Sequence, residues 1–264
     1  MKRRSSEASI GYYLYGFVRT DEDLDFGPIG VPHGGQPARV HTIINGPLAA
    51  VVSEISTAEK LLPLRRNLAP HNEVIREVMK RTTIVPMAFG HVARGEEEIK
   101  RALKRNRQAL LEELQRLWQK VEMGLKVKWD VDNVFEHVLS KDPELSAMRD
   151  QVFGRASAAS QAEKIELGRM FEDRLSRERE REVERITEAL RPDVAEVRVK
   201  PPKGETTVVD LAFLIDREGA GTFEDRVCQI AAGYPAEYVF DYSGPWAPFD
   251  FVDVDLSMKS AEVV

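Results

Sequence analysis

Histidine and cysteine are the residues of this 264-residue chain best suited to bind a metal ion or to act in catalysis. None of the histidines occurs at a metal-ligand spacing such as HxxxH. His71 stands beside Asn72 and Glu73 where a helix is expected to begin, so it could cap the helix or act as a general base. The single Cys228 excludes an intramolecular disulfide and any CxxC motif, and we expect it to be a small core residue. We therefore predict no catalytic group, no metal site and no cofactor. The five histidines are His33, His41, His71, His91 and His137.

Motifs that bind nucleotides or activate a serine are missing from the sequence, which contains no GxSxG, no P-loop and no GxGxxG. The glycine-rich residues 30–35 lead into no helix, so they predict a loop rather than a phosphate site. Tyr238, Phe240 and Tyr242 share one strand face and could stack on RNA bases or form a core beneath helices. The net charge of -6 favours the core and argues against nucleic acid or an anionic membrane as a partner.

The N-terminus, residues 1–10, is expected to be disordered. Lys2, Arg3 and Arg4 imitate the basic start of a secretion signal, but no small-residue cleavage site follows the short apolar run after them. No window approaches the roughly 18 unbroken apolar residues of a membrane helix. We therefore expect an intracellular protein without a membrane-spanning segment.

The first half of the chain predicts a mixed α+β domain over residues 11–123. Asn45-Gly46 favours a tight hairpin between two β-rich runs. Pro86 interrupts its strand and indicates a bulge or a sheet edge. Three glutamates follow Gly95, where the helix dipole favours negative charge. Strands are expected over residues 12–18, 39–44, 48–55 and 82–89, helices over 70–81 and 95–121, and a loop over 21–38.

The second half predicts a separate domain over residues 124–244, with its boundary at Gly124. Strands are expected over residues 125–129, 194–199, 206–215 and 236–242, and helices over 131–139, 143–153, 160–190 and 222–232. If the helices between residues 131 and 190 count as one crossover, the order is βαββαβ. That order is the ferredoxin-like split βαβ arrangement with an enlarged helical crossover. The fold class is therefore α+β with two domains.

A C-terminal tail, residues 245–264, follows this domain. Pro245 and Pro248 surround Trp246, so the segment is expected to be extended and to form neither a helix nor an inner strand. Burial of an aromatic side chain contributes on the order of 5 kcal/mol, so Trp246, Phe249 and Phe251 together could offset the ordering of about ten residues. The tail could close the ferredoxin-like domain of its own chain, or it could present Trp246 and Phe249 to a partner.

A run of alternating charges, residues 176–182, lies inside the helix expected over 160–190. Opposite charges stand at i,i+3 and like charges at i,i+4, so the local pairing energies roughly cancel. The apolar stripe is interrupted there, and we expect the helix to stand clear of its core. The segment is either a solvated face or a docking surface. The candidate partner contacts of the chain are Arg177, Arg179, Arg181, Trp246 and Phe249.

Four stretches in series resemble the gas vesicle protein GvpF/GvpL family. They are YLYGFV at residues 13–18, HNEV through IVPMAFG at 71–90, GLKVKWD at 124–130 and YSGPWAPFDFV at 242–252. The chain departs from the family pattern at Ala88, where a basic residue is expected before Phe89-Gly90, and this puts any role of charge there in doubt.

The resemblance implies a two-domain α+β protein with a modified ferredoxin-like C-terminal domain. It also implies a non-enzymatic minor structural component or assembly factor of gas vesicles. Such a protein acts early, in nucleation, by binding the shell protein GvpA and other accessory gas vesicle proteins. Its location would be the gas vesicle, and the cytoplasm before assembly. An alternative is a ligand-sensing ferredoxin-like regulatory module, which a buried polar pocket around His71, Glu73 and Asp130 would favour.

Overall fold

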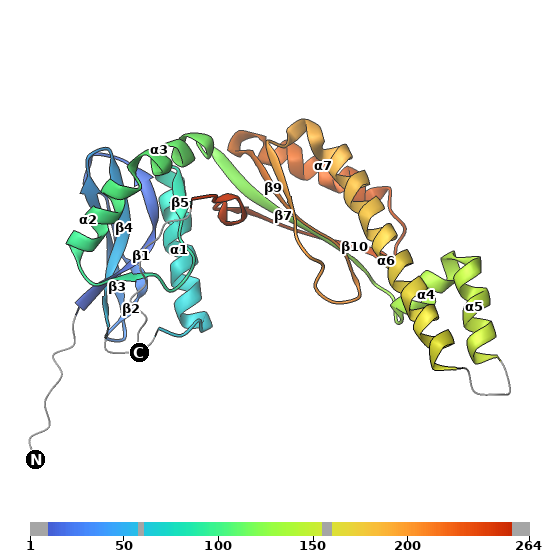
Figure 1. The fold of residues 1–264 in the computed structure, drawn as a ribbon. Coiled ribbons are helices and arrows are strands. Elements are labelled where there is room, and N and C mark those ends of the chain that lie inside the picture. The colour runs from blue at the N-terminus through green and yellow to red at the C-terminus, as the bar shows by residue number, and fades with distance from the viewer. Residues whose placement is uncertain (1–9, 58–60, 155–159, 255–264) are drawn as a thin grey trace, which may run out of the picture. The chain divides into compact units, whose positions relative to one another are not determined.

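The computed structural model describes residues 10–57, 61–154 and 160–254. These residues form two compact units of mixed α+β structure, which confirms the expected fold class at that level (Figure 1). One unit contains the residues up to Glu122 together with those from Pro245 onward, and the other contains Met123–Gly244. The disordered N-terminus that we expect at residues 1–10 lies outside the described residues except for Ile10, which begins the first strand.

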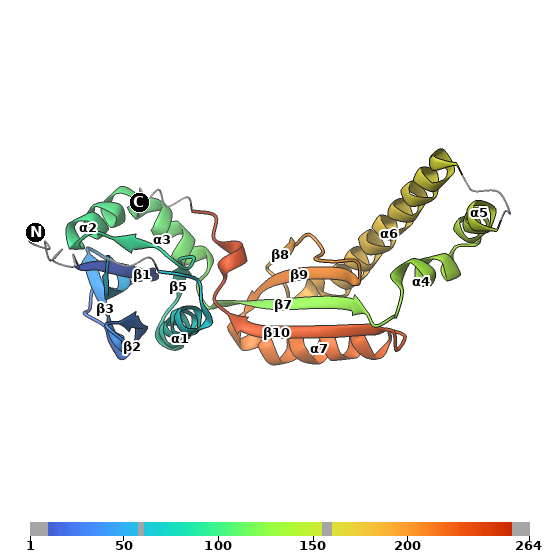
Figure 2. The ribbon, with the colours of Figure 1, turned by 90° about the horizontal axis from the view of Figure 1, so that it is seen from below.

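The first unit is an antiparallel sheet with helices on both faces. The strand order is β2 (Asp25–His33), β3 (Gln36–Asn45), β4 (Leu48–Ser56), β1 (Ile10–Arg19) and β5 (Ile84–Pro86). A further short strand, β6 (Val92–Ala93), also pairs with β1. Helix α1 (Arg65–Arg81) covers one face, and α2 (Glu96–Arg105) and α3 (Arg107–Arg116) cover the other (Figures 1 and 2). Because both faces are covered, the inner strands β1 and β4 are buried over most of their length rather than at alternate residues.

The predicted hairpin at Asn45-Gly46 is confirmed. Asn45 pairs with Leu48, and Gly46 has the positive φ of 66° that the turn requires. The predicted loop over residues 21–38 is wrong, because half of it is the edge strand β2 and its last three residues begin β3. The ladder between β2 and β3 shifts register at several points, including Gly27 with φ 77°, so an edge strand accommodates the glycines and prolines through bulges.

Two helix boundaries in the first unit differ from the expectation. Helix α1 begins at Arg65, so Pro70 lies inside it rather than at its start. The long helix expected over residues 95–121 is broken at Asn106, whose side-chain amide donates to the carbonyl of Ala102. Val121, assigned from the sequence to that helix, instead belongs to strand β7 (Lys120–Trp129).

The second unit is a four-stranded sheet in the order β10 (Tyr238–Trp246), β7, β9 (Thr207–Asp216), β8 (Glu196–Val199). Helices α6 (Gln161–Leu190) and α7 (Ala220–Ala232) pack on one face of this sheet (Figures 1 and 2). Helices α4 (Val134–Lys141) and α5 (Pro143–Phe153) pack against the N-terminal half of α6. The described residues also include three short 3-10 helices: η1 (Arg191–Asp193), η2 (Arg217–Gly219) and η3 (Phe249–Phe251).

The aromatic face of β10 lies against helices α6 and α7 and is half-buried, which favours the interpretation that it packs beneath helices. The ring of Phe240 lies 4.9 Å from that of Tyr234, and the ring of Tyr242 lies 6.2 Å from that of Phe223 on α7. The expectation that Cys228 is a core residue is wrong. Cys228 is exposed, because α7 buries its neighbour Val227 against the sheet instead.

Candidate functional site

Residues 245–253, the tail segment, lie on the first unit and are held there through their main chain. The backbone N–H of Asp250 donates to Glu122 Oε2 at 2.8 Å, and that of Asp253 donates to Glu113 Oε1 at 3.1 Å. The guanidinium of Arg116 donates to the carbonyl of Phe251 and also binds Glu113. Pro245 and Trp246 end strand β10, but the hydrogen-bonding partners of Asp250, Phe251 and Asp253 belong to the first unit. The expectation that the tail closes the second unit is therefore wrong for these later residues.

Sequence reasoning did not single out the two carboxylates that hold the tail segment. Glu113 and Glu122 are only 6% and 7% exposed, which is unusual for glutamate. Glu113 sits among the apolar residues Leu110 and Leu114 of α3, and Glu122 sits between Val121 and Met123 of β7. An acid inside an apolar stripe was therefore the signal that could have identified them.

The side chains of the tail segment divide into anchors and exposed groups. Phe251 and Ala247 are buried, at 0% and 3% exposure. Trp246 and Phe249 keep 46% and 38% of their surface exposed. The buried side chains and the backbone hydrogen bonds fix the segment, so the two exposed aromatic side chains stand at defined positions on the surface.

A hollow of about 270 Å³ separates the tail segment from helix α1. Its helix side offers the apolar side chains of Ile75 and Met79, and its tail side offers Trp246 and Phe249. This arrangement could receive an apolar side chain of another protein, since aromatic and methionine side chains are enriched in the centres of interfaces. The residues that line it are Asn72, Ile75, Arg76, Met79, Glu122, Pro245, Trp246, Ala247 and Phe249.

A cluster of aromatic rings surrounds the buried His71 next to this hollow, and Phe249 belongs to both. Tyr15 stacks on His71 at 5.8 Å between ring centroids, Phe89 meets it edge-on at 5.7 Å, and Phe249 of the tail segment lies at 6.3 Å. The oxygen of Tyr13 accepts from the N–H of Gly90 at 3.2 Å and lies 2.9 Å from His71 Nδ1. The cluster thus brings together residues of the first, second and fourth stretches noted in the sequence.

The pKa values of this cluster indicate that His71 has a structural role. His71 is 2% exposed, and burial lowers its pKa to about 4, against the opposing effect of a hydrogen bond with the backbone of Met87. Burial also raises the pKa of Tyr15 to about 12 and that of Tyr13 further. At neutral pH these groups are therefore uncharged. Tyr13 can donate its proton to Nδ1, and the ring is then held as the tautomer protonated at Nε2.

His71, Glu73 and Asp130 are the three residues proposed for a buried polar pocket, which would favour an enzyme or a sensor. Glu73 is partly exposed and pairs with Arg76 at 2.7 Å, whereas Asp130 belongs to the second unit. In the described part of the chain, no group of three or more His, Cys, Asp and Glu side chains could hold a metal ion. The helices within the described ranges include none that is long and apolar enough to span a membrane.

The charged segment of α6 does not stand clear of the core. Arg179 donates to the carbonyls of Thr207, Gly204 and Glu205, so it is bound to the turn before β9. Glu182 is buried and accepts from the hydroxyl of Tyr234 at 2.5 Å. Arg179 and Glu182 therefore lie on the inward face of the helix, where they make polar contacts instead of apolar ones.

The other two arginines of this segment are exposed. Arg177 pairs with Asp173 at 3.1 Å, and Arg181 pairs with Glu178 at 2.7 Å. Of the five candidate partner contacts, the structure thus brings Trp246 and Phe249 together at one hollow. The arginines lie in the second unit.

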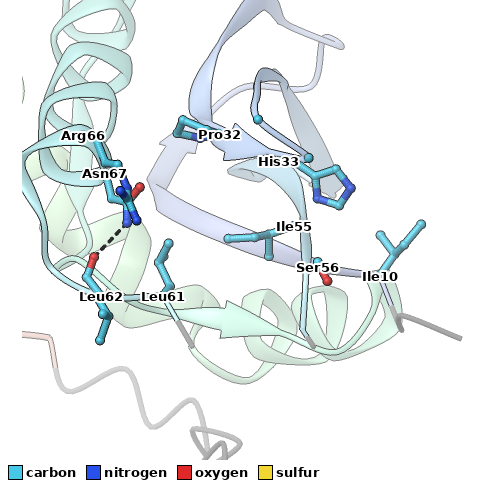
Figure 3. A pocket seen from close by; sticks show the side chains of 11 residues that line it. Ile10, Pro32, His33, Ile55, Ser56, Leu61, Leu62, Arg66 and Asn67 are labelled. Carbon is cyan, nitrogen blue, oxygen red and sulfur yellow. Dashed lines mark hydrogen bonds between the residues drawn. The ribbon is translucent and has the colours of Figure 1, made fainter. Parts of the chain in front are cut away.

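A second hollow, of about 810 Å³, lies in the first unit near the turn between β2 and β3 (Figure 3). His33 lies on one side of it, and Arg66 and Asn67 of α1 lie on the other (Figure 3). Asn67 donates to the carbonyl of Leu62 at 2.8 Å. The polar groups therefore do not converge on one point as they do in a small-molecule site.

The structure is that of a two-unit α+β protein whose first unit holds two half-exposed aromatic side chains beside a hollow. The chain matches the family model described as "Gas vesicle synthesis protein GvpL/GvpF" over residues 11–253, and it belongs to that family. The matched range ends at Asp253, the last residue of the tail segment that is hydrogen-bonded to the first unit.

Relatives of known name agree with this assignment. The chain is 28% identical to gas vesicle protein F of a Streptomyces species, over 91% of this chain and 99% of the relative. It is 29% identical to gas vesicle protein F of Dolichospermum flosaquae, over 94% and 99%. The crystal structure of GvpF from Anabaena matches with a TM-score of 0.77 at 28% identity, over 93% of this chain and 99% of that chain. The protein therefore has a role connected with gas vesicles.

Proposed function

We propose that this chain is a non-enzymatic assembly factor and minor structural component of gas vesicles. It binds the shell protein GvpA and other accessory gas vesicle proteins during nucleation of the vesicle, first in the cytoplasm and then at the vesicle itself. Family membership supports the link to gas vesicles. The observation that carries the binding role is the hollow between α1 and the tail segment, where Trp246 and Phe249 are held half-exposed.

Physical chemistry supports a partner of this kind. A shell subunit that presents an apolar face to gas would aggregate if it were free in water, so its assembly needs a protein that covers that face. Exposed aromatic side chains on a fixed backbone bind at a low entropic cost, because few of their bonds must be ordered on binding. Trp246 and Phe249 are therefore the proposed contacts for an apolar segment of GvpA.

The second unit has its own place in the proposal. We infer that it is a modified ferredoxin-like domain, since its sheet contains its fourth, first, third and second strands in that order. The exposed Arg177 and Arg181 on α6 are proposed contacts for an accessory protein. A ligand-sensing ferredoxin-like module would bind its ligand in this unit, whereas the hollow in Figure 3 lies in the first unit and so does not support that alternative.

Co-purification with GvpA tests the proposal. The chain and GvpA are expressed together, and the recovered GvpA is compared between the natural chain and the double variant Trp246→Ala, Phe249→Ala. Phe153→Ala is the matched control, because Phe153 is also an exposed aromatic residue, at 64%, but lies on α5. We expect the double variant to recover at least tenfold less GvpA and the control to be unchanged. Equal recovery by all three chains would remove the hollow from the mechanism.

A further inference from the structure

A third hollow of the first unit, distinct from the tail site, surrounds Trp118. It has a volume of about 220 Å³ and is built from the end of β1, the link between α1 and β5, and the end of α3. Leu114 of α3 is buried beside it, and Trp118 keeps 52% of its surface exposed. The residues that line it are Arg19, Thr82, Thr83, Leu114, Gln115 and Trp118.

The backbone fixes Trp118 at this position. The next residue, Gln119, has a φ of 54°, a left-handed backbone conformation that residues other than glycine rarely adopt. The N–H of Gln119 donates to Thr83 Oγ1 at 3.3 Å, and that of Lys120 donates to the carbonyl of Leu117 at 3.0 Å. Leu117 is fully buried. The chain thus keeps a large apolar ring in water next to two buried leucines, although the turn is tightly held.

The ionisable side chain that lines this hollow is positively charged. Arg19 is the only ionisable residue among the described residues that line it, and within the described ranges Arg19 forms no ion pair. The backbone of Arg19 is fixed by its pairing with Leu48 in the sheet. Tryptophan and arginine are the residues most enriched among those that dominate binding at protein interfaces.

We propose that this hollow is a second protein-binding site, whose occupant is an acidic segment that carries an apolar side chain. The apolar side chain packs between Leu114 and the indole of Trp118, and the carboxylate of an adjacent Asp or Glu pairs with Arg19. Thr82 also lines the hollow, and its hydroxyl can bind the backbone of the segment. Pairing with an acid gives the site its selectivity against neutral and basic segments.

Photo-crosslinking in the native host tests this site. Gln115, an exposed residue of the hollow, is replaced by the crosslinking amino acid benzoylphenylalanine, and the attached segment is identified by mass spectrometry. Gln151 on α5, exposed in the second unit, is the matched control position. We expect an adduct from position 115 that maps to a segment containing Asp or Glu next to an apolar residue. Arg19→Glu and Trp118→Ala should each lower its yield at least tenfold, whereas Arg19→Lys should keep more than half of it.

The results separate this site from the tail site. No adduct at position 115 above the level at position 151 would overturn the inference, as would an adduct that Arg19→Glu leaves unchanged. An adduct with a basic segment or with lipid would also overturn it. Recovery of GvpA with the Arg19→Glu chain is measured in parallel, and it should equal that of the natural chain. A failure of the Trp118 site therefore leaves the role of Trp246 and Phe249 to be decided by its own experiment.

Discussion

The buried His71 predicts a specific loss of stability in mild acid. In the unfolded chain its pKa is 6.5, and burial in the folded chain lowers it to about 4. A base with a lowered pKa takes up its proton more readily in the unfolded state. The stability is therefore complete above pH 6.5 and is lost as the pH falls towards 4. At pH 5 the loss is about 2 kcal/mol, and below pH 4 it levels off at about 3 kcal/mol.

The comparison that isolates this effect uses His71→Gln, which keeps a polar side chain but cannot titrate. The free energy of opening is measured by hydrogen–deuterium exchange of the amides of β1 at pH 7.5 and pH 5.0. Between these pH values the natural chain should lose about 2 kcal/mol more than the variant. Burial lowers the pKa of His91 as well, but that contribution is common to both chains. An equal loss in the two chains would refute the argument that His71 is buried in its neutral form.

Three further substitutions test packing at defined positions. Phe251→Ala removes a fully buried ring, so urea unfolding should report a loss of about 3 to 5 kcal/mol in the first unit, whereas Phe153→Ala should change stability by less than about 0.5 kcal/mol. Gly16→Ala would place a Cβ atom 2.5 Å from the carbonyl oxygen of Val85, so exchange of the β1 amides should accelerate. Gly168→Ala meets no atom within 4 Å on α6, so it should raise stability by about 0.5 to 1 kcal/mol, and a lower melting temperature would contradict this.

The features predicted well from the sequence depend on a few neighbouring residues. The Asn45-Gly46 turn is one, since only the local φ values decide it. The start of α6 is another, where Ser160, the first residue of the predicted range, forms a capping box with Glu163. The loop assigned to residues 21–38 failed because a sheet edge tolerates Gly27 and Pro28, and only the neighbour β3 shows that the segment is an edge.

In the candidate site too, the features that depend on neighbouring residues were predictable and those that depend on distant residues were not. Trp246 and Phe249 could be identified because proline on both sides of a tryptophan excludes a helix there. Their support could not, since the hydrogen bonds from Asp250 to Glu122 and from Asp253 to Glu113 join residues 128 and 140 positions apart. Arg179 was misjudged because an alternating charge run looks solvated until the carbonyls of residues 204–207 are placed beside it.

The return of the tail segment to the first unit has a consequence for synthesis on the ribosome. The first unit lacks the tail segment until residues 245–253 have been made, although the part of this unit that precedes the second unit is complete at Glu122. At about 5 to 20 residues per second, translation of residues 123–244 takes roughly 6 to 24 s. During this interval the pocket of Phe251 and the carboxylates of Glu113 and Glu122 are open to water. The nascent first unit therefore exposes a surface that the finished chain covers.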